Sequence, residues 1–208
     1  MASRRLPAAP AKGDPVTFWN WRRGAASHAT SGNNAVALAA DLAPIELYTA
    51  DARIVGWIAA GGRRVTDLLN ERGELRLWRP SPGPIHDTAA LDGTPPSESD
   101  ESGEWETLET DRVILAMPPE WRASRQLRLH RRLRRVALTV GPFNVTGNLH
   151  LAPGGDLGPH ILHRGPRWLP LTEAYLLHTA DPPFEHVVSV VIVNTAHVSH
   201  LVPLVTLA

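Results

Sequence analysis

The sequence has no cysteine, and Lys12 is its only lysine. The lack of cysteine excludes disulfide bonds, zinc sites with thiolate ligands and cysteine nucleophiles. Long hydrophobic runs are missing too, because the longest apolar stretches, residues 35–40 and 187–193, are too short to cross a bilayer. Residues 1–15 hold two arginines but no apolar stretch behind them, unlike a secretory signal. We therefore expect a cytoplasmic protein with no membrane partner.

Charge of one sign is also lacking, since the formal net charge is zero. A neutral chain has no general electrostatic attraction to nucleic acid or to membranes. Apolar residues make up 43% of the 208 residues, which is ordinary for a globular protein and too high for a wholly disordered one. Length and composition predict a folded protein of one domain or two small ones.

Apolar residues alternate with a period of two from residue 44 onward, which predicts a mainly β fold with short helices. Residues 45–60 fit two strands joined by a turn. Residues 65–72 fit a short helix with Thr66 as its N-cap, and Gly73 is placed to end it. Residues 1–43 precede this pattern and are expected to form a disordered or irregular arm.

The same pattern returns downstream at a constant offset. The matched pairs are Ile45 and Val136, Leu47 and Leu138, Ile54 and Val145, Gly56 and Gly147, Ile58 and Leu149, and Ala60 and Leu151. Gly141-Pro142 falls at the turn of the second hairpin, where glycine suits the first central position of a type II′ turn. We therefore predict two tandem, similar, barrel-like or sandwich-like halves, residues 44–118 and 132–208. Eight residues are expected in their cores: Ile54, Ile58, Leu69, Leu77, Val145, Leu149, Leu169 and Ile192.

The two expected halves differ by an insertion and are joined by a basic connector. Residues 81–109 contain several prolines and acids but no arginine or lysine, which predicts a flexible acidic loop. Arginines crowd the connector, residues 119–131, and the start of the second half. They are Arg122, Arg125, Arg128, Arg131, Arg132, Arg134 and Arg135. Two counterparts fit this cluster, namely the phosphates of a nucleic acid and the acidic loop.

Three short motifs carry a resemblance. The segment 64–70 reads Arg-Val-Thr-Asp-Leu-Leu-Asn, residues 168–172 read Trp-Leu-Pro-Leu-Thr, and residues 193–198 form a closing Val-Asn strand. Together they resemble a family of small bacterial β-rich domains, over about two-thirds of the chain. The resemblance implies a β-rich fold and no particular activity, cofactor or metal.

Motifs for catalysis or metal binding are weak. His160 and His163 form a His-x-x-His pair, as do His197 and His200, but no acidic residue stands at a supporting spacing. The sequence has no Gly-x-Ser-x-Gly element and no phosphate-binding glycine loop. Asp67 and Asn70 are interpreted as helix-terminal structure. We accordingly predict no catalytic, cofactor-binding or metal-binding residues.

The function expected from these features is a non-enzymatic protein-interaction or structural role, with an unidentified protein as partner. Trp19 and Trp21 are the candidate partner contacts, unless they pack on the body of the protein. The alternative is a protein that binds single-stranded nucleic acid through the arginine cluster, residues 122–135. An enzyme or a metal-binding protein is the least favoured alternative.

Overall fold

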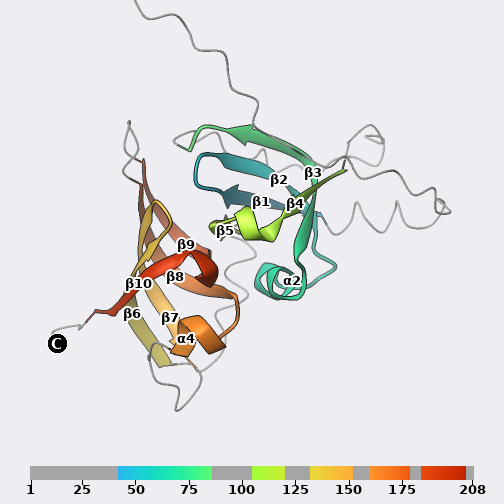
Figure 1. Cartoon of the computed structure of the whole chain (residues 1–208). Coiled ribbons are helices and arrows are strands. Elements are labelled where there is room, and N and C mark those ends of the chain that lie inside the picture. Colours follow the sequence, from blue (N-terminus) through green and yellow to red (C-terminus); the bar gives the residue numbers. More distant parts are fainter. Residues whose placement is uncertain (1–41, 86–104, 120–131, 152–159, 179–183, 205–208) are drawn as a thin grey trace, which may run out of the picture.

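The computed structural model describes residues 42–85, 105–119, 132–151, 160–178 and 184–204. Within these ranges ten strands form one antiparallel sheet in the order β10-β6-β7-β8-β9-β5-β1-β2-β3-β4 (Figure 1). The strands are β1 (Leu42–Tyr48), β2 (Arg53–Ala59), β3 (Glu74–Gly83), β4 (Trp105–Glu109), β5 (Leu115–Met117), β6 (Arg132–Val140), β7 (Phe143–Leu151), β8 (Trp168–His178), β9 (Phe184–Asn194) and β10 (Val198–Pro203). The predicted mainly β class is confirmed.

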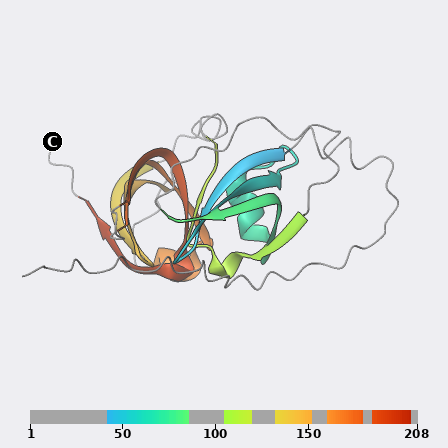
Figure 2. The same ribbon diagram turned by 90° about the horizontal axis from the view of Figure 1, so that it is seen from above.

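The expectation of two separate halves needs correction, because every described strand belongs to one open sheet. β5 pairs with β9, with Leu115 opposite Val193 and Ala116 opposite Ile192, and so joins residues 42–117 to residues 132–203. Seen from above, β6 to β10 curl into a tight ring, while β1 to β4 curve around a helix (Figure 2). Curvature is local, and hydrogen bonding is continuous.

Each hairpin follows from its local sequence. In β7 the residues alternate strictly between buried and more exposed positions, from Phe143 to Leu151. The turn between β6 and β7 is Gly141-Pro142, with Val140 opposite Phe143. Gly141 has φ +53°, which an L side chain adopts only with strain. This agrees with the type II′ turn predicted from the sequence.

The helix α2 (Val65–Glu71) lies where the sequence predicts it. Its N-cap is Arg64, whereas Thr66 lies inside the helix and is buried, so the predicted cap is wrong. Gly73 follows the helix without the positive φ of a glycine stop signal. A second helix, α4, spans His160–Arg164 among the described residues. Leu68 and Leu69 of α2 are buried, which fixes the helix against the sheet.

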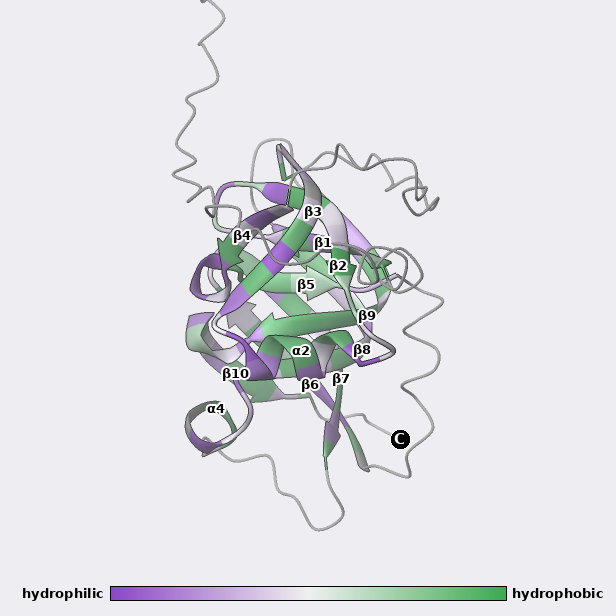
Figure 3. Cartoon of the chain, turned by 90° about the vertical axis from the view of Figure 1, so that its right-hand side faces the viewer, coloured by the Kyte–Doolittle hydropathy of each residue, from purple (hydrophilic) through white to green (hydrophobic). Residues whose placement is uncertain are grey.

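Two hydrophobic clusters form the core, and both cross the β5–β9 joint. The first combines strands β1 to β3 and α2 with Trp168, Val190 and Ile192 from β8 and β9. The second combines β6 to β9 with Tyr48 and Leu115, among others. Figure 3 shows a hydrophobic ribbon along β5 and β9, where the two parts of the sheet meet. The apolar side chains that cross the joint each contribute about 1.5–3 kcal/mol when fully buried, so the joint belongs to the core.

All eight residues predicted in the core are buried. The bounds of the acidic insertion are wrong, because Ser81–Gly83 completes β3 and Trp105–Glu109 forms β4. A 3-10 turn, η1 (Thr110–Arg112), precedes β5. A second 3-10 turn, η3 (Thr195–His197), precedes β10, which was expected only as part of the second half. Residues 1–41, 86–104 and 120–131 lie outside the described residues.

Candidate interaction surface

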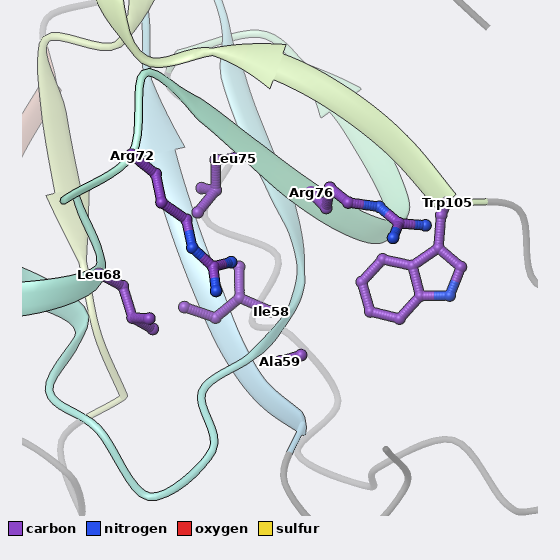
Figure 4. A pocket seen from close by; sticks show the side chains of 7 residues that line it. All are labelled: Ile58, Ala59, Leu68, Arg72, Leu75, Arg76 and Trp105. Carbon is purple, nitrogen blue, oxygen red and sulfur yellow. The ribbon is translucent and has the colours of Figure 1, made fainter. Parts of the chain in front are cut away.

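A pocket of about 160 Å³ opens beside β4. Its lining residues are Ile58, Ala59, Leu68, Arg72, Leu75, Arg76 and Trp105, drawn from β2, α2, β3 and β4 (Figure 4). The floor is aliphatic, while two guanidinium groups and an indole form the rim. The Arg76 guanidinium carbon lies 5.1 Å from the centre of the Trp105 ring, within cation–π distance. Such a pocket suits an apolar side chain that has an acidic or aromatic neighbour.

The outer edge of β4 adjoins this pocket. In the described part of the chain β4 pairs with β3 alone, so one side of β4 offers backbone N–H and C=O groups to a further strand. Glu74 and Glu109 stand directly opposite each other where β3 meets β4, and both are exposed. Like charges in directly opposed positions destabilise a strand pair. A cationic partner at this point would relieve their repulsion.

The strand β10 forms the other edge of the sheet. Among described strands it pairs with β6 alone. Val202 on this strand is 38% exposed, and Leu204, just after the strand, is 41% exposed. His200 is also exposed on this strand. The two edges therefore differ in character, with acids and an indole on β4 and apolar residues with a histidine on β10.

A buried charged cluster lies in the first hairpin and serves the core. The Glu46 carboxylate accepts hydrogen bonds from the Tyr48 hydroxyl and from the Arg53 side chain. Burial and the Glu46 carboxylate hold the pKa of Tyr48 well above its usual range. The Tyr48 ring packs against Phe143 and Phe184 at centre distances of 5.7 and 5.5 Å. The cluster thus fixes the two parts of the sheet to each other and has no exposed reactive group.

The predicted arginine cluster is only partly visible. Arg122, Arg125, Arg128 and Arg131 lie outside the described residues, as do Trp19 and Trp21. Arg132, Arg134 and Arg135 belong to β6. Successive side chains of a strand point to opposite faces, so Arg134 and Arg135 lie on opposite faces of β6. One guanidinium nitrogen of Arg135 donates to the Glu173 backbone oxygen at 3.1 Å. Arg134 and Arg135 therefore do not form one patch.

Asp111, which follows the acidic insertion, and His197 of one histidine pair have structural contacts. Asp111 forms an ion pair with Arg167 at 2.6 Å, an arginine outside the predicted cluster. His197 bonds through Nε2 to the Asp111 backbone oxygen at 2.7 Å. Across the described ranges no group of three or more histidine and acidic side chains is placed to hold a metal ion. No helix in those ranges is long and apolar enough to span a membrane.

Asn70 was correctly interpreted as structural. Its side-chain amide donates to the backbone oxygens of Thr66 and Trp168 at 2.9 and 3.1 Å, and its oxygen accepts from the Trp168 N–H at 2.9 Å. It thereby ties α2 to the start of β8. The pocket residues Arg72, Arg76 and Trp105 were missed by sequence reasoning. A tryptophan between two glutamates within an acidic run was the only signal for them.

Comparison of the chain with protein-family models, curated proteins and solved structures gives no match.

Proposed function

We propose that the chain is a non-enzymatic protein-interaction module, built from two copies of one five-stranded unit, that takes up an extended partner segment along β4. The duplication is supported first by strand order. Residues 42–117 pair in the order β5-β1-β2-β3-β4, and residues 132–203 pair in the order β10-β6-β7-β8-β9. Each block thus repeats the same sequence of neighbours, with a helix between its second and third strands.

Register gives a second, independent line of support. Ile45 faces Gly56 in the first hairpin, and Val136 faces Gly147 in the second, at the offset found in the sequence. Each of these glycines also marks a register shift against the next strand, between β2 and β3 and between β7 and β8. At Gly147 a Cβ would lie 3.1 Å from the Leu171 Cβ, a tight contact that favours glycine at the bulge.

The 3-10 turns agree atom for atom. The Thr110 N–H donates to the Gly73 oxygen at 3.0 Å, and the Thr195 N–H donates to the Arg167 oxygen at 2.8 Å. Each threonine hydroxyl donates to the same carbonyl oxygen, at 2.9 Å in both turns. Chance similarity between two β meanders would not reproduce these side-chain contacts. Duplication therefore makes β9 the counterpart of β4, and β10 the counterpart of β5.

The interaction surface follows from this correspondence, and one observation carries it. The outer edge of β9 is covered by β5, whereas the corresponding edge of β4 has no neighbour among the described strands. The backbone of β4 is thus already shaped to accept a strand. Strand addition supplies main-chain hydrogen bonds, and an adjacent pocket adds selectivity for a side chain. The pocket rimmed by Arg72, Arg76 and Trp105 is placed to supply this selectivity.

The N–H groups that would receive a partner can be identified. The Asn194 N–H on β9 donates outward to the Ile114 oxygen at 3.0 Å. Alternate residues of an antiparallel strand point their N–H groups to the same side. Asn194 corresponds to Glu109, so the N–H groups of Glu109 and Thr107 point away from β3. Thr107→Pro removes one outward donor, and Thr107→Ala keeps it as a matched control.

The test is selection of extended peptides from a displayed library on the full chain, followed by affinity measurement by fluorescence anisotropy. We expect Thr107→Pro to weaken selected peptides at least tenfold, and Thr107→Ala to leave them within about twofold. Trp105→Ala should weaken only peptides with an apolar side chain at the pocket. Equal binding by Thr107→Pro and wild type would refute the proposal. A random single-stranded oligonucleotide in the same assay tests the nucleic-acid alternative, whose binding must fall steeply with salt.

A further inference from the structure

The joint between the two parts of the sheet is the pairing of β5 with β9, and further side-chain interactions stabilise it. Beyond its two strand pairs, Asn194 at the end of β9 is fully buried against η1. Its side-chain amide donates to the backbone oxygens of Val113 and Thr110 at 2.8 and 3.3 Å. Opposite Asn194 on β8 stands Trp168, which is also fully buried. Two strand pairs, the hydrogen bonds of the Asn194 amide and the buried Trp168 indole therefore stabilise the joint.

Both strands of this joint have counterparts at edges that no other described strand covers. β4 is the counterpart of β9 and β10 is the counterpart of β5, and these two strands form opposite ends of the sheet (Figure 1). One molecule therefore carries both members of a second joint, on edges that face away from each other. A single chain cannot use both edges in one contact, whereas two chains can.

We propose that β10 of one copy of this chain pairs antiparallel with β4 of a second copy, in the register of the internal joint. This inference rests on the proposed function and names the partner. In the internal joint Leu115 lies opposite Val193, and the corresponding proposed pair is His200 opposite Leu108. In the same way, the internal pair Ala116 and Ile192 corresponds to the proposed pair Leu201 and Thr107. Thr107 is thus the residue whose outward N–H meets the second copy.

Continuing this register by two residues brings Pro203 of one copy opposite Trp105 of the other. Trp105 is half-buried and lies on the rim of the pocket beside β4. The exposed Val202 and Leu204 flank Pro203 and would lose water contact against the second copy. A basic or acidic partner peptide would have no need for an apolar edge on β10. A second copy explains both edges at once.

The β4 edge carries acidic side chains that affect which edges can meet. The buried pair Trp168 and Asn194 of the internal joint is replaced on β3 and β4 by the exposed pair Glu74 and Glu109. Two β4 edges in contact would bring these acids together, and their repulsion disfavours contact between two like edges and leaves the head-to-tail contact of β4 with β10. Such a heterologous contact closes into a ring or extends as a filament.

The proposed contact between copies lacks a hydrogen-bond donor that the internal β5–β9 joint has, because Glu109 stands at the position of Asn194. Asn194 donates its amide to two backbone oxygens, and a carboxylate at Glu109 has no proton to donate. The variant Glu109→Asn would place an amide donor on β4, at the position that corresponds to Asn194 on β9. One net hydrogen bond corresponds to about three- to tenfold in association. Misfolding can also increase association, so a tighter association counts for the proposal only when the melting temperature of Glu109→Asn matches that of wild type.

The experiment is sedimentation velocity of the full chain over a range of concentrations. We expect concentration-dependent association in wild type, about three- to tenfold tighter association in Glu109→Asn, and loss of association in Thr107→Pro. Thr107→Ala should associate like wild type. Thermal melting of each variant verifies that its fold is intact.

A mixing experiment establishes the direction of the contact. Leu201→Pro removes the outward N–H of β10, as Thr107→Pro does for β4. The two variants, each unable to extend, should form a one-to-one complex when mixed, because one free β10 edge and one free β4 edge remain. Association of Thr107→Pro alone, or a monomeric Glu109→Asn, would overturn the proposal. Peptide binding at β4 with a monomeric chain would overturn it while sparing the proposed function.

Discussion

Asn194 should be among the most costly residues to truncate, although it is a polar residue in a protein with a large apolar core. Its side chain takes part in four hydrogen bonds. They join it to the Val113 oxygen at 2.8 Å, the Ala196 N–H at 3.2 Å, the Thr110 oxygen at 3.3 Å and the Arg167 Nε at 3.4 Å. The residue is 0% exposed, so water does not replace these partners in the folded state.

The magnitude follows from the geometry. A typical hydrogen bond contributes about 0.5–1.5 kcal/mol net, and a buried polar group left without a partner costs about 1–3 kcal/mol. Counting the two shorter bonds fully and the two longer ones weakly, Asn194→Ala should lower the free energy of unfolding by about 2–4 kcal/mol. For a chain of this size the melting temperature should fall by about 5–12 °C.

The assay is urea denaturation followed by tryptophan fluorescence, with thermal melting by circular dichroism alongside. Asn148→Ala is the matched control, because Asn148 donates to the Glu173 carboxylate at 2.8 Å on the exposed side of the sheet. This control should change the free energy of unfolding by less than about 0.5 kcal/mol. A loss below about 1 kcal/mol for Asn194→Ala would refute the view that this amide fastens the joint.

Three further predictions test other parts of the fold. Asn70→Ala should cost about 1–3 kcal/mol in urea denaturation, because it removes both hydrogen bonds to the Trp168 backbone; no loss would show that α2 is held by apolar contacts alone. Gly141→Ala should cost about 1–2 kcal/mol, since φ is +53° and its Cβ would lie 2.8 Å from the Ile114 Cδ1; an unchanged melting temperature would contradict this. Burial lowers the pKa of His178, so the unfolded chain takes up the proton at higher pH, and stability falls as pH drops below about 6.5. His178→Gln should make melting temperature less sensitive to pH between about 7 and 5, and an unchanged slope would assign the effect to other groups.

Local pattern was sufficient to predict the hairpins and the core positions. Alternation predicts that Ile54, Ile58 and Val145 face the core, whichever strands pair with theirs, because side-chain direction depends only on position along the strand. Gly141-Pro142 likewise fixes its turn by its own backbone preferences. The offset between Gly56 and Gly147 survives in the structure as matching bulges.

Pairing between distant segments was beyond such reasoning. β5 has only three residues, and its pairing with β9 depends on which edges remain free after each meander has formed. The burial of Asn194 is a consequence of this pairing, so its role could not be assigned from the sequence alone. Trp105 was hidden by its acidic neighbours, which predict a solvated loop while the residue itself pairs with Trp78 in a strand. The resemblance to small bacterial β-rich domains stays a prediction.

The internal and outer joints differ in what they require of their side chains. β5 and β9 belong to one chain, and a covalent link raises their effective concentration to the millimolar range or above. Two strand pairs and an amide fastening are then sufficient. The edges of β4 and β10 have no such link, so the proposed contact between them needs further attraction, from the indole of Trp105 and from the exposed Val202. Because Glu74 and Glu109 stand where the internal joint has Trp168 and Asn194, we expect the proposed contact to be weaker than the internal joint and to depend on protein concentration.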